Sequence, residues 1–489
     1  MQNKKINLKV NIVLNILYEI LVVLTPLITA PYVSRVLQPA GVGIYSYTNS
    51  LVTYFVMFAA LGTAGYGKRE IARLRDNKEQ YSKAFWEIEL ITIFTTLMCT
   101  IGWIIFSFCY SKYKIYMLIW TFTLVSQIFD ISWLYGGLEK FQYTVLINSL
   151  CKMASVISIF LFIKSIEDVN VYILICSVST LVGAASMWFF LPKQLCKTEI
   201  SFKTMIQHFK NTLVYFLPTI ASSIYTVLDK TLIGAITKDD AQNGYYEQAT
   251  KVLTIIKSAC FVAINGVTTS RASYLYANKD EAGMKRLMDM NYQLTTFLTV
   301  GACFGIAAIA KTFVPLFFGN GYNPVITIIY ILSPITLCIC ISGVAGSVYY
   351  TPANKIKLAS ILMIFGSLLN LILNIILIPN FGSYGAAVGS VAAELLIAVL
   401  FVCFSKGYIS WNMIFVYLWK KIIAGIIMFL SIFCIQLFLD GYINDYLLLS
   451  VELLAGVCIY SLILLILRDK SMGIAIDMVK TKVTNFKNK

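Results

Sequence analysis

The stretch SSIYTVLDKTLIGAIT, residues 222–237, places an acid and a base side by side in a run that otherwise has the composition of a membrane helix. A lone charge at the centre of a bilayer helix costs about 2.5–3.5 kcal/mol on insertion scales, so charges there need partners or a function. Neighbouring helix residues point about 100° apart, so Asp229 and Lys230 each need a partner on another helix. Lys230 is a candidate anion-binding residue, and Asp229 is its orienting partner or an ion-coupling carboxylate. A structural salt bridge between helices is the alternative.

Four more cations fall within or at the ends of apolar runs: Arg35, Lys152, Lys251 and Lys257. Lys152 lies about ten residues into its run, roughly 15 Å deep at 1.5 Å per residue. Arg35 stands at the end of its run, where its side chain can also reach lipid headgroups. Lys251 follows Glu247 by four residues, which equally favours a local ion pair. All these cations are candidates for binding an anionic substrate in one aqueous chamber.

The candidate residues for ion coupling are acids in similar runs: Glu19, Asp130, Glu247 and Glu394, beside Asp229. Each could bind a proton or a sodium ion, or hydrogen-bond across helices. The chain has a single histidine, His208, and its 12 cysteines form no CxxC pair. Histidine acid–base catalysis, a zinc site and a disulfide framework are therefore not expected, nor is a cofactor other than a coupling ion.

The composition defines the elements that position these charges. The 489 residues are 58% hydrophobic and 13% charged, with a mean hydropathy of +0.77. Apolar runs of about 20 residues, the length that crosses a bilayer, recur along the whole chain. We therefore predict an all-α polytopic membrane protein with about 14 transmembrane helices. They are expected at 11–33, 42–64, 84–109, 115–135, 143–164, 169–191, 211–236, 243–268, 292–316, 325–350, 356–378, 384–405, 413–438 and 444–467.

The distribution of basic residues predicts the orientation of the chain. Roughly three quarters of the 39 Lys and Arg residues fall in the termini and in alternate links, which the positive-inside rule assigns to the cytoplasm. Both termini are therefore expected in the cytoplasm. This topology accounts for most of the net charge of +15, so no nucleic-acid partner is expected.

An internal repeat predicts the domain organisation. The segment AGVGIYSYTNSLV, which opens the second span, resembles DAQNGYYEQATKVL, which opens the eighth, at an offset of about 200 residues. Repeats of this kind build secondary transporters with a site between the halves. We expect a six-helix lobe at 1–195, a second at 196–408, and a terminal helix pair with a basic tail at 409–489.

Six segments in chain order carry a family pattern: LTPLITAPYVSRVLQPAGVGIYSYTNSLVTYF, LGTAGYGKREIAR, DISWLYGGLEKF, VLDKTLIG, NGYYEQATKV and NLILNIILIPNFGSYGAAVGSVAAE. They resemble the Wzx-type polysaccharide flippases of the multidrug/oligosaccharidyl-lipid/polysaccharide exporter superfamily. The resemblance implies transfer of an undecaprenyl-pyrophosphate-linked oligosaccharide from the inner to the outer leaflet of the bacterial cytoplasmic membrane. Such transfer serves capsule, exopolysaccharide or O-antigen synthesis. Membrane lipids, a glycan polymerase and other biosynthetic proteins are the expected partners.

Two other functions remain open from the sequence. A drug or cation exporter of the same superfamily should line its cavity with acidic rather than basic groups, and this chain has lysines within its spans. A membrane glycosyltransferase or glycan polymerase should carry acidic residues on a sizeable outer loop, whereas the outer links here are short. The sequence therefore favours a carrier and not an enzyme.

Overall fold

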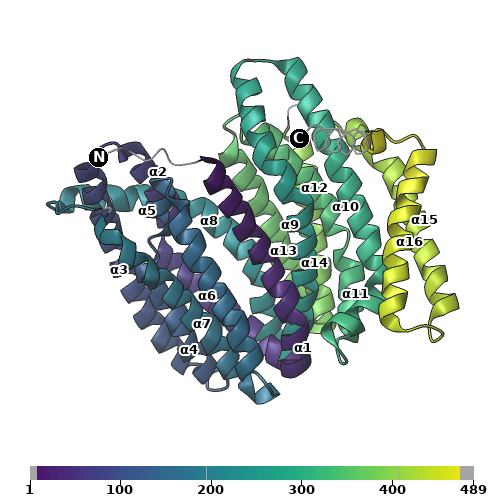
Figure 1. Ribbon diagram of the computed structural model, residues 1–489, viewed down its shortest axis with the longest axis horizontal. Helices are drawn as coiled ribbons and strands as arrows, with labels where there is room; N and C mark the ends of the chain where they lie inside the picture. Colours follow the sequence, from purple (N-terminus) through teal and green to yellow (C-terminus); the bar gives the residue numbers. More distant parts are fainter. Residues whose placement is uncertain (1–7, 194, 406, 474–489) are drawn as a thin grey trace. The chain divides into compact units, whose positions relative to one another are not determined.

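The computed structural model describes the backbone of residues 8–193, 195–405 and 407–473, and every regular element in these ranges is helical (Figure 1). Side chains are described in the same ranges except at residues 8–20, 23, 141, 143, 192–193, 217–219, 221–226 and 261–267. The chain forms two compact units, residues 1–244 and residues 245–489.

The first unit opens with α1, Leu8–Ala60, which is two helices joined at Gln38. The backbone of Gln38 has φ 57° and ψ 174°, outside the helical region, and the following Pro39 disfavours helical backbone at the residue before it. The first two predicted spans lie on either side of this break. The short helix α2, Thr63–Leu74, begins after Gly62, whose φ of 76° suits a residue without a side chain.

Helices α3 to α8 complete the first unit. They are α3 (Lys78–Phe108), α4 (Lys114–Phe129), α5 (Ser132–Gly137), α6 (Phe141–Phe162), α7 (Val169–Ser186) and α8 (Phe202–Thr237), with short 3-10 turns at Ile166–Asp168 and Met187–Lys193. Helix α4 packs against α3 and α7, and α6 packs against α7 (Figure 1). Two buried tryptophans in this core keep their indole N–H groups bonded: Trp103 donates to the carbonyl of Met117 and Trp120 donates to Thr48, both at 2.9 Å.

Two glycines allow a close backbone contact between α1 and the start of α9, Asp240–Ala277. A Cβ on Gly43 would lie 1.6 Å from the carbonyl oxygen of Asp240, and a Cβ on Gly244 would lie 2.0 Å from that of Pro39. No other residue type fits at either position without moving the backbone. These glycines are the ones aligned by the predicted repeat.

The second unit contains most of α9 and seven further α-helices. They are α10 (Glu281–Phe318), α11 (Asn323–Leu332), α12 (Ile335–Ala345), α13 (Ile356–Phe381), α14 (Ser383–Cys403), α15 (Trp411–Leu439) and α16 (Asp445–Ile466), with a π-helical turn at Gly346–Tyr350. Helix α13 packs against α14, and α15 packs against both α10 and α16. The terminal pair α15 and α16 is therefore part of the packed unit.

Large apolar side chains are exposed along most of these helices, for example Phe94, Ile105, Phe365 and Leu454. An exposed apolar surface of this extent requires a hydrocarbon environment. In the described part of the chain, 10 helices are long and apolar enough to cross a membrane, or 11 if the bent pair α11 and α12 counts as one span. The prediction of an all-α polytopic membrane protein is confirmed. The lobe boundaries near residues 195 and 408 stay a prediction.

Candidate functional site

Three of the predicted cations belong to different helices of the first unit. Arg35 lies on α1 and is exposed, whereas Lys152 on α6 and Lys230 on α8 are half-buried. Half-burial of a lysine within an apolar helix is the property expected of a ligand-binding cation in a membrane protein. Their convergence on one chamber stays a prediction.

The two remaining cations lie on α9 in the second unit. The ammonium of Lys251 forms an ion pair with Glu247 at 3.2 Å, four residues earlier on the same helix. The local pair considered from the sequence is therefore present, and it neutralises Lys251. Lys257 is exposed two turns further along α9.

The predicted coupling acids differ in their surroundings. Asp229 and Glu394 are buried, at 6% exposure each. Asp130 ends α4, and its carboxylate accepts the backbone N–H of Ser132 at 3.0 Å, so it shapes the turn into α5. The side chain of Glu19 lies outside the described residues.

A buried polar network in the second unit joins α9, α13 and α14. The hydroxyls of Tyr246 and Ser390 lie 3.0 Å apart, and the amide of Asn370 donates to Ser390 at 3.4 Å. Asn374 in turn donates to Asn370 at 3.1 Å. Hydrogen bonds of this kind hold membrane helices together.

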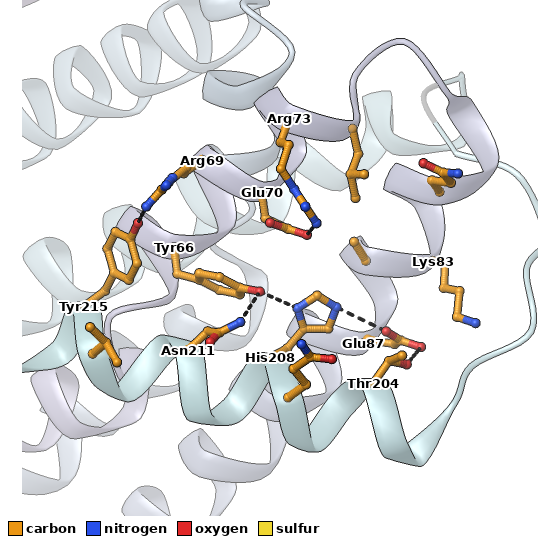
Figure 2. A pocket seen from close by; sticks show the side chains of 15 residues that line it. Tyr66, Arg69, Glu70, Arg73, Lys83, Glu87, Thr204, His208, Asn211 and Tyr215 are labelled. Atoms are coloured by element: carbon orange, nitrogen blue, oxygen red, sulfur yellow. Dashed lines mark hydrogen bonds and ion pairs between the residues drawn. The ribbon is translucent and has the colours of Figure 1, made fainter.

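The first unit also contains a polar pocket of about 600 Å³ between α2, α3 and the first half of α8 (Figure 2). Its lining is rich in charged, amide and hydroxyl groups. The lining residues are Tyr66, Arg69, Glu70, Arg73, Leu74, Gln80, Lys83, Ala84, Glu87, Thr204, Gln207, His208, Asn211, Val214 and Tyr215. No predicted site residue is among them.

A chain of hydrogen bonds crosses one wall of this pocket (Figure 2). The carboxylate of Glu87 accepts from the backbone N–H of Ser201 at 3.0 Å and from Thr204 at 2.6 Å, and its second oxygen lies 3.2 Å from Nε2 of His208. Nδ1 of His208 lies 2.6 Å from the hydroxyl of Tyr66, which also accepts from the Asn211 amide at 3.2 Å. This pattern fits a neutral imidazole that donates from Nε2 and accepts at Nδ1.

The protonation of His208 follows from its position in this chain. His208 precedes the seventh predicted span, and burial lowers its pKa, with the nearby Glu87 acting in the opposite direction. Burial therefore favours the neutral form that the hydrogen bonds require.

Helices α2 and α3 also supply the cations of the pocket. Arg69 donates to the hydroxyl of Tyr215, and Arg73 pairs with Glu70 at 2.5 Å (Figure 2). Lys83 faces the same pocket from α3, and no hydrogen bond or ion pair joins it to any residue that the structure describes. The lining therefore holds three cations, Arg69, Arg73 and Lys83, beside two carboxylates, Glu70 and Glu87.

The sequence spacing of α8 explains how one helix supplies this wall. Thr204, His208, Asn211 and Tyr215 recur at intervals of four, three and four residues, so they share one face of the helix. This periodicity was the available signal for the pocket. The sequence did not predict the pocket, because most of this face precedes the seventh predicted span at 211–236 and because Glu87 lies more than a hundred residues away along the chain.

Comparisons with known proteins bear on the class of protein. The fold resembles a solved structure of the lipid II flippase MurJ in an inward closed conformation, with a TM-score of 0.74, 18% identity, and coverage of 94% of this chain and 99% of the other. It also resembles an inward-facing multidrug resistance MATE family transporter of the MOP superfamily, with a TM-score of 0.62, 14% identity, and coverage of 78% and 93%. These likenesses show that the chain has the polytopic helical fold of membrane transporters of known structure.

The sequence comparisons define the family. The family model described as "Polysaccharide biosynthesis protein" matches residues 8–269, more than half of the chain. A protein of Escherichia coli (strain K12) named "Putative O-antigen transporter" is 24% identical over 392 residues, which cover 78% of this chain and 93% of that protein. A protein of Shigella dysenteriae with the same name is 22% identical over 390 residues, with 78% and 95% covered. The chain belongs to the polysaccharide biosynthesis protein family, as the resemblance in its sequence predicted.

Proposed function

We propose that this protein is a flippase for undecaprenyl-pyrophosphate-linked oligosaccharide units in capsule, exopolysaccharide or O-antigen synthesis. It moves them from the inner to the outer leaflet of the bacterial cytoplasmic membrane, with both of its own termini in the cytoplasm. Family membership and the transporter fold support this proposal. The names of the two curated relatives support the O-antigen class of substrate.

The single observation that carries the substrate class is the presence of half-buried lysines within membrane helices. Lys152 and Lys230 are cations at positions where the bilayer excludes unpaired charge. A pyrophosphate carries about two negative charges and cannot cross about 30 Å of hydrocarbon unaided, so its carrier needs cations inside the membrane. Lys257 supplies a further exposed cation from α9.

The mechanism that we propose is alternating access. Two lobes rock about a central site, the cations hold the diphosphate, and the isoprenoid chain stays in the lipid. Asp229 orients Lys230 or binds a coupling proton or sodium ion, and Glu394 is a second buried carboxylate available for coupling. A glycan polymerase then receives the unit at the outer leaflet.

The test is delivery of lipid-linked glycan to the outer leaflet by charge variants at matched membrane abundance. Arg should rescue much of the transport at Lys152, Lys230 and Lys257, Gln little, and Glu none, because the requirement is for positive charge. The matched control is Lys203→Glu, an exposed lysine in the link before the seventh predicted span. Normal transport by all three Glu variants would exclude these lysines as the diphosphate site.

A further inference from the structure

We propose that the pocket between α2, α3 and α8 binds the anionic, phosphate-bearing headgroup of a membrane lipid. This site is separate from the intramembrane lysines. It lies within the first unit, and its lining includes none of the residues proposed to bind the translocated substrate.

Two cations of the pocket have N–H donors that remain available for a ligand. The guanidinium of Arg69 has five N–H donors, and Tyr215 is its one hydrogen-bond partner among the described residues. Lys83 brings three ammonium protons from the facing helix, and no described group accepts them. Phosphate oxygens are acceptors only, and they form their strongest hydrogen bonds with guanidinium and ammonium donors.

The two carboxylates of the pocket are already bonded to protein donors, so they do not compete with a bound anion for the free cations. Glu70 is paired with Arg73, and Glu87 is 1% exposed with three donors directed at its oxygens. Both carboxylates are therefore satisfied by the protein. The unused hydrogen-bonding capacity in the pocket belongs to the cations.

The size and lining of the pocket suit more than a bare phosphate. A volume of about 600 Å³ lies within the range of small-molecule sites. Gln80, Gln207 and Asn211 contribute amides that can bind the hydroxyl groups of a glycerol or sugar headgroup.

The first half of α8 relates this pocket to the membrane surface. Phe202, Ile206, Phe209 and Leu213 form a second stripe at the same helical spacing, and each is between 38% and 70% exposed. This stripe is offset by two residues, or about 200°, from the stripe that lines the pocket. An amphipathic helix with such faces lies along the membrane interface with its apolar side in the lipid. The polar pocket on its other side is then at the depth of the lipid phosphates.

The experiment measures lipid binding to the full-length protein purified in detergent. Native mass spectrometry would compare dioleoylphosphatidylglycerol with dioleoylphosphatidylcholine, and inorganic pyrophosphate would serve as the soluble phosphate probe. Arg69→Gln and Lys83→Gln should each weaken phosphatidylglycerol binding about tenfold, because each removes one charge-assisted contact. Phosphatidylcholine binding should not change.

Two further variants separate binding in the pocket from a general effect of surface charge. Arg75→Gln is the control, since Arg75 forms an exposed ion pair with Glu139 at 2.7 Å outside the pocket. If this variant weakened phosphatidylglycerol binding as much as Arg69→Gln does, the effect would be one of general surface charge, and the proposal would be overturned. Val214→Trp narrows the pocket without changing its charge, and it should also weaken phosphatidylglycerol binding. Unchanged binding in both Val214→Trp and the Arg69–Lys83 double variant would refute the site. Occupancy by pyrophosphate without occupancy by phosphatidylglycerol would overturn the lipid assignment.

Discussion

The carboxylate of Glu87 holds Thr204 and His208 on α8 and the backbone N–H of Ser201 just before it, and Glu87→Ala tests how much these contacts contribute. The substitution removes the acceptor for Ser201 N–H, Thr204 and His208. Thr204 retains a second acceptor, the carbonyl of Ser201 at 2.9 Å, so two donors lose their partner. Hydrogen bonds to a charged group contribute about 1.5–3 kcal/mol each. Water that enters the open pocket replaces part of the loss, so we take the lower end and expect about 3 kcal/mol. Glu87→Gln keeps one carbonyl oxygen and should cost about half as much.

The assay is the free energy of unfolding of the purified protein in native bilayer-like conditions, for example by steric trapping. Glu139→Ala is the matched control, because it removes a carboxylate whose ion pair with Arg75 is about half exposed on both sides. Exposed pairs of this kind contribute about 0.2–1 kcal/mol. If Glu87→Ala costs no more than Glu139→Ala, the hydrogen-bond chain does not hold α8 and the reasoning is refuted.

Three further predictions concern His208, Lys421 and Gly43. Burial lowers the pKa of His208 in the folded protein below its unfolded value of about 6.5. The neutral imidazole therefore contributes stability above that pH, and this contribution is lost as the pH falls through the folded pKa. The thermal midpoint should drop between pH 7 and pH 5, and the drop should be smaller in His208→Gln than in the wild type. Lys421 on α15 is fully buried, and its Nζ lies 3.4 Å from Oδ2 of Asp469. Asp469→Ala should lower the free energy of unfolding by about 3–5 kcal/mol, because it leaves a buried cation without its carboxylate. Adding Lys421→Met should recover much of that loss in a double-mutant cycle. Gly43→Ala should sharply lower the yield of folded protein because its Cβ has no room, whereas Gly102→Ala, with its nearest contact at 3.7 Å, should leave the yield unchanged.

Hydropathy predicted the most apolar helices closely. The last four predicted spans began within two residues of α13, α14, α15 and α16, because these segments are apolar around their whole circumference and end at polar or glycine-containing links. Hydropathy failed where a helix is amphipathic. Helix α8 begins nine residues before the seventh predicted span, since its first turns alternate apolar and polar faces and average to a polar composition.

The candidate site could be predicted only in part. Single charges inside apolar runs are visible in a sequence, and so is a pair spaced by four residues such as Glu247 and Lys251, which the structure joins. The pocket is formed by groups such as Glu87 and His208, whose proximity depends on how α3 and α8 pack. From the sequence alone, Glu87 and His208 each have the character of a solvated residue near the end of a span. Tertiary packing creates the site, and the local pattern along α8 indicates only the face that this one helix contributes.

The reciprocal contact of Gly43 and Gly244 has the symmetry of a homodimer interface, in which one residue faces the counterpart of itself. In a true homodimer, one codon controls both sides, and every mutation changes the contact twice. Here the two glycines are encoded separately, so a mutation alters one side and leaves the other intact. The two sides are also unequal, since an added Cβ would lie 1.6 Å from the nearest atom at Gly43 and 2.0 Å from the nearest atom at Gly244. An internal repeat such as the one predicted from the sequence can therefore give its two copies different tolerances to mutation and different roles, which identical subunits cannot do.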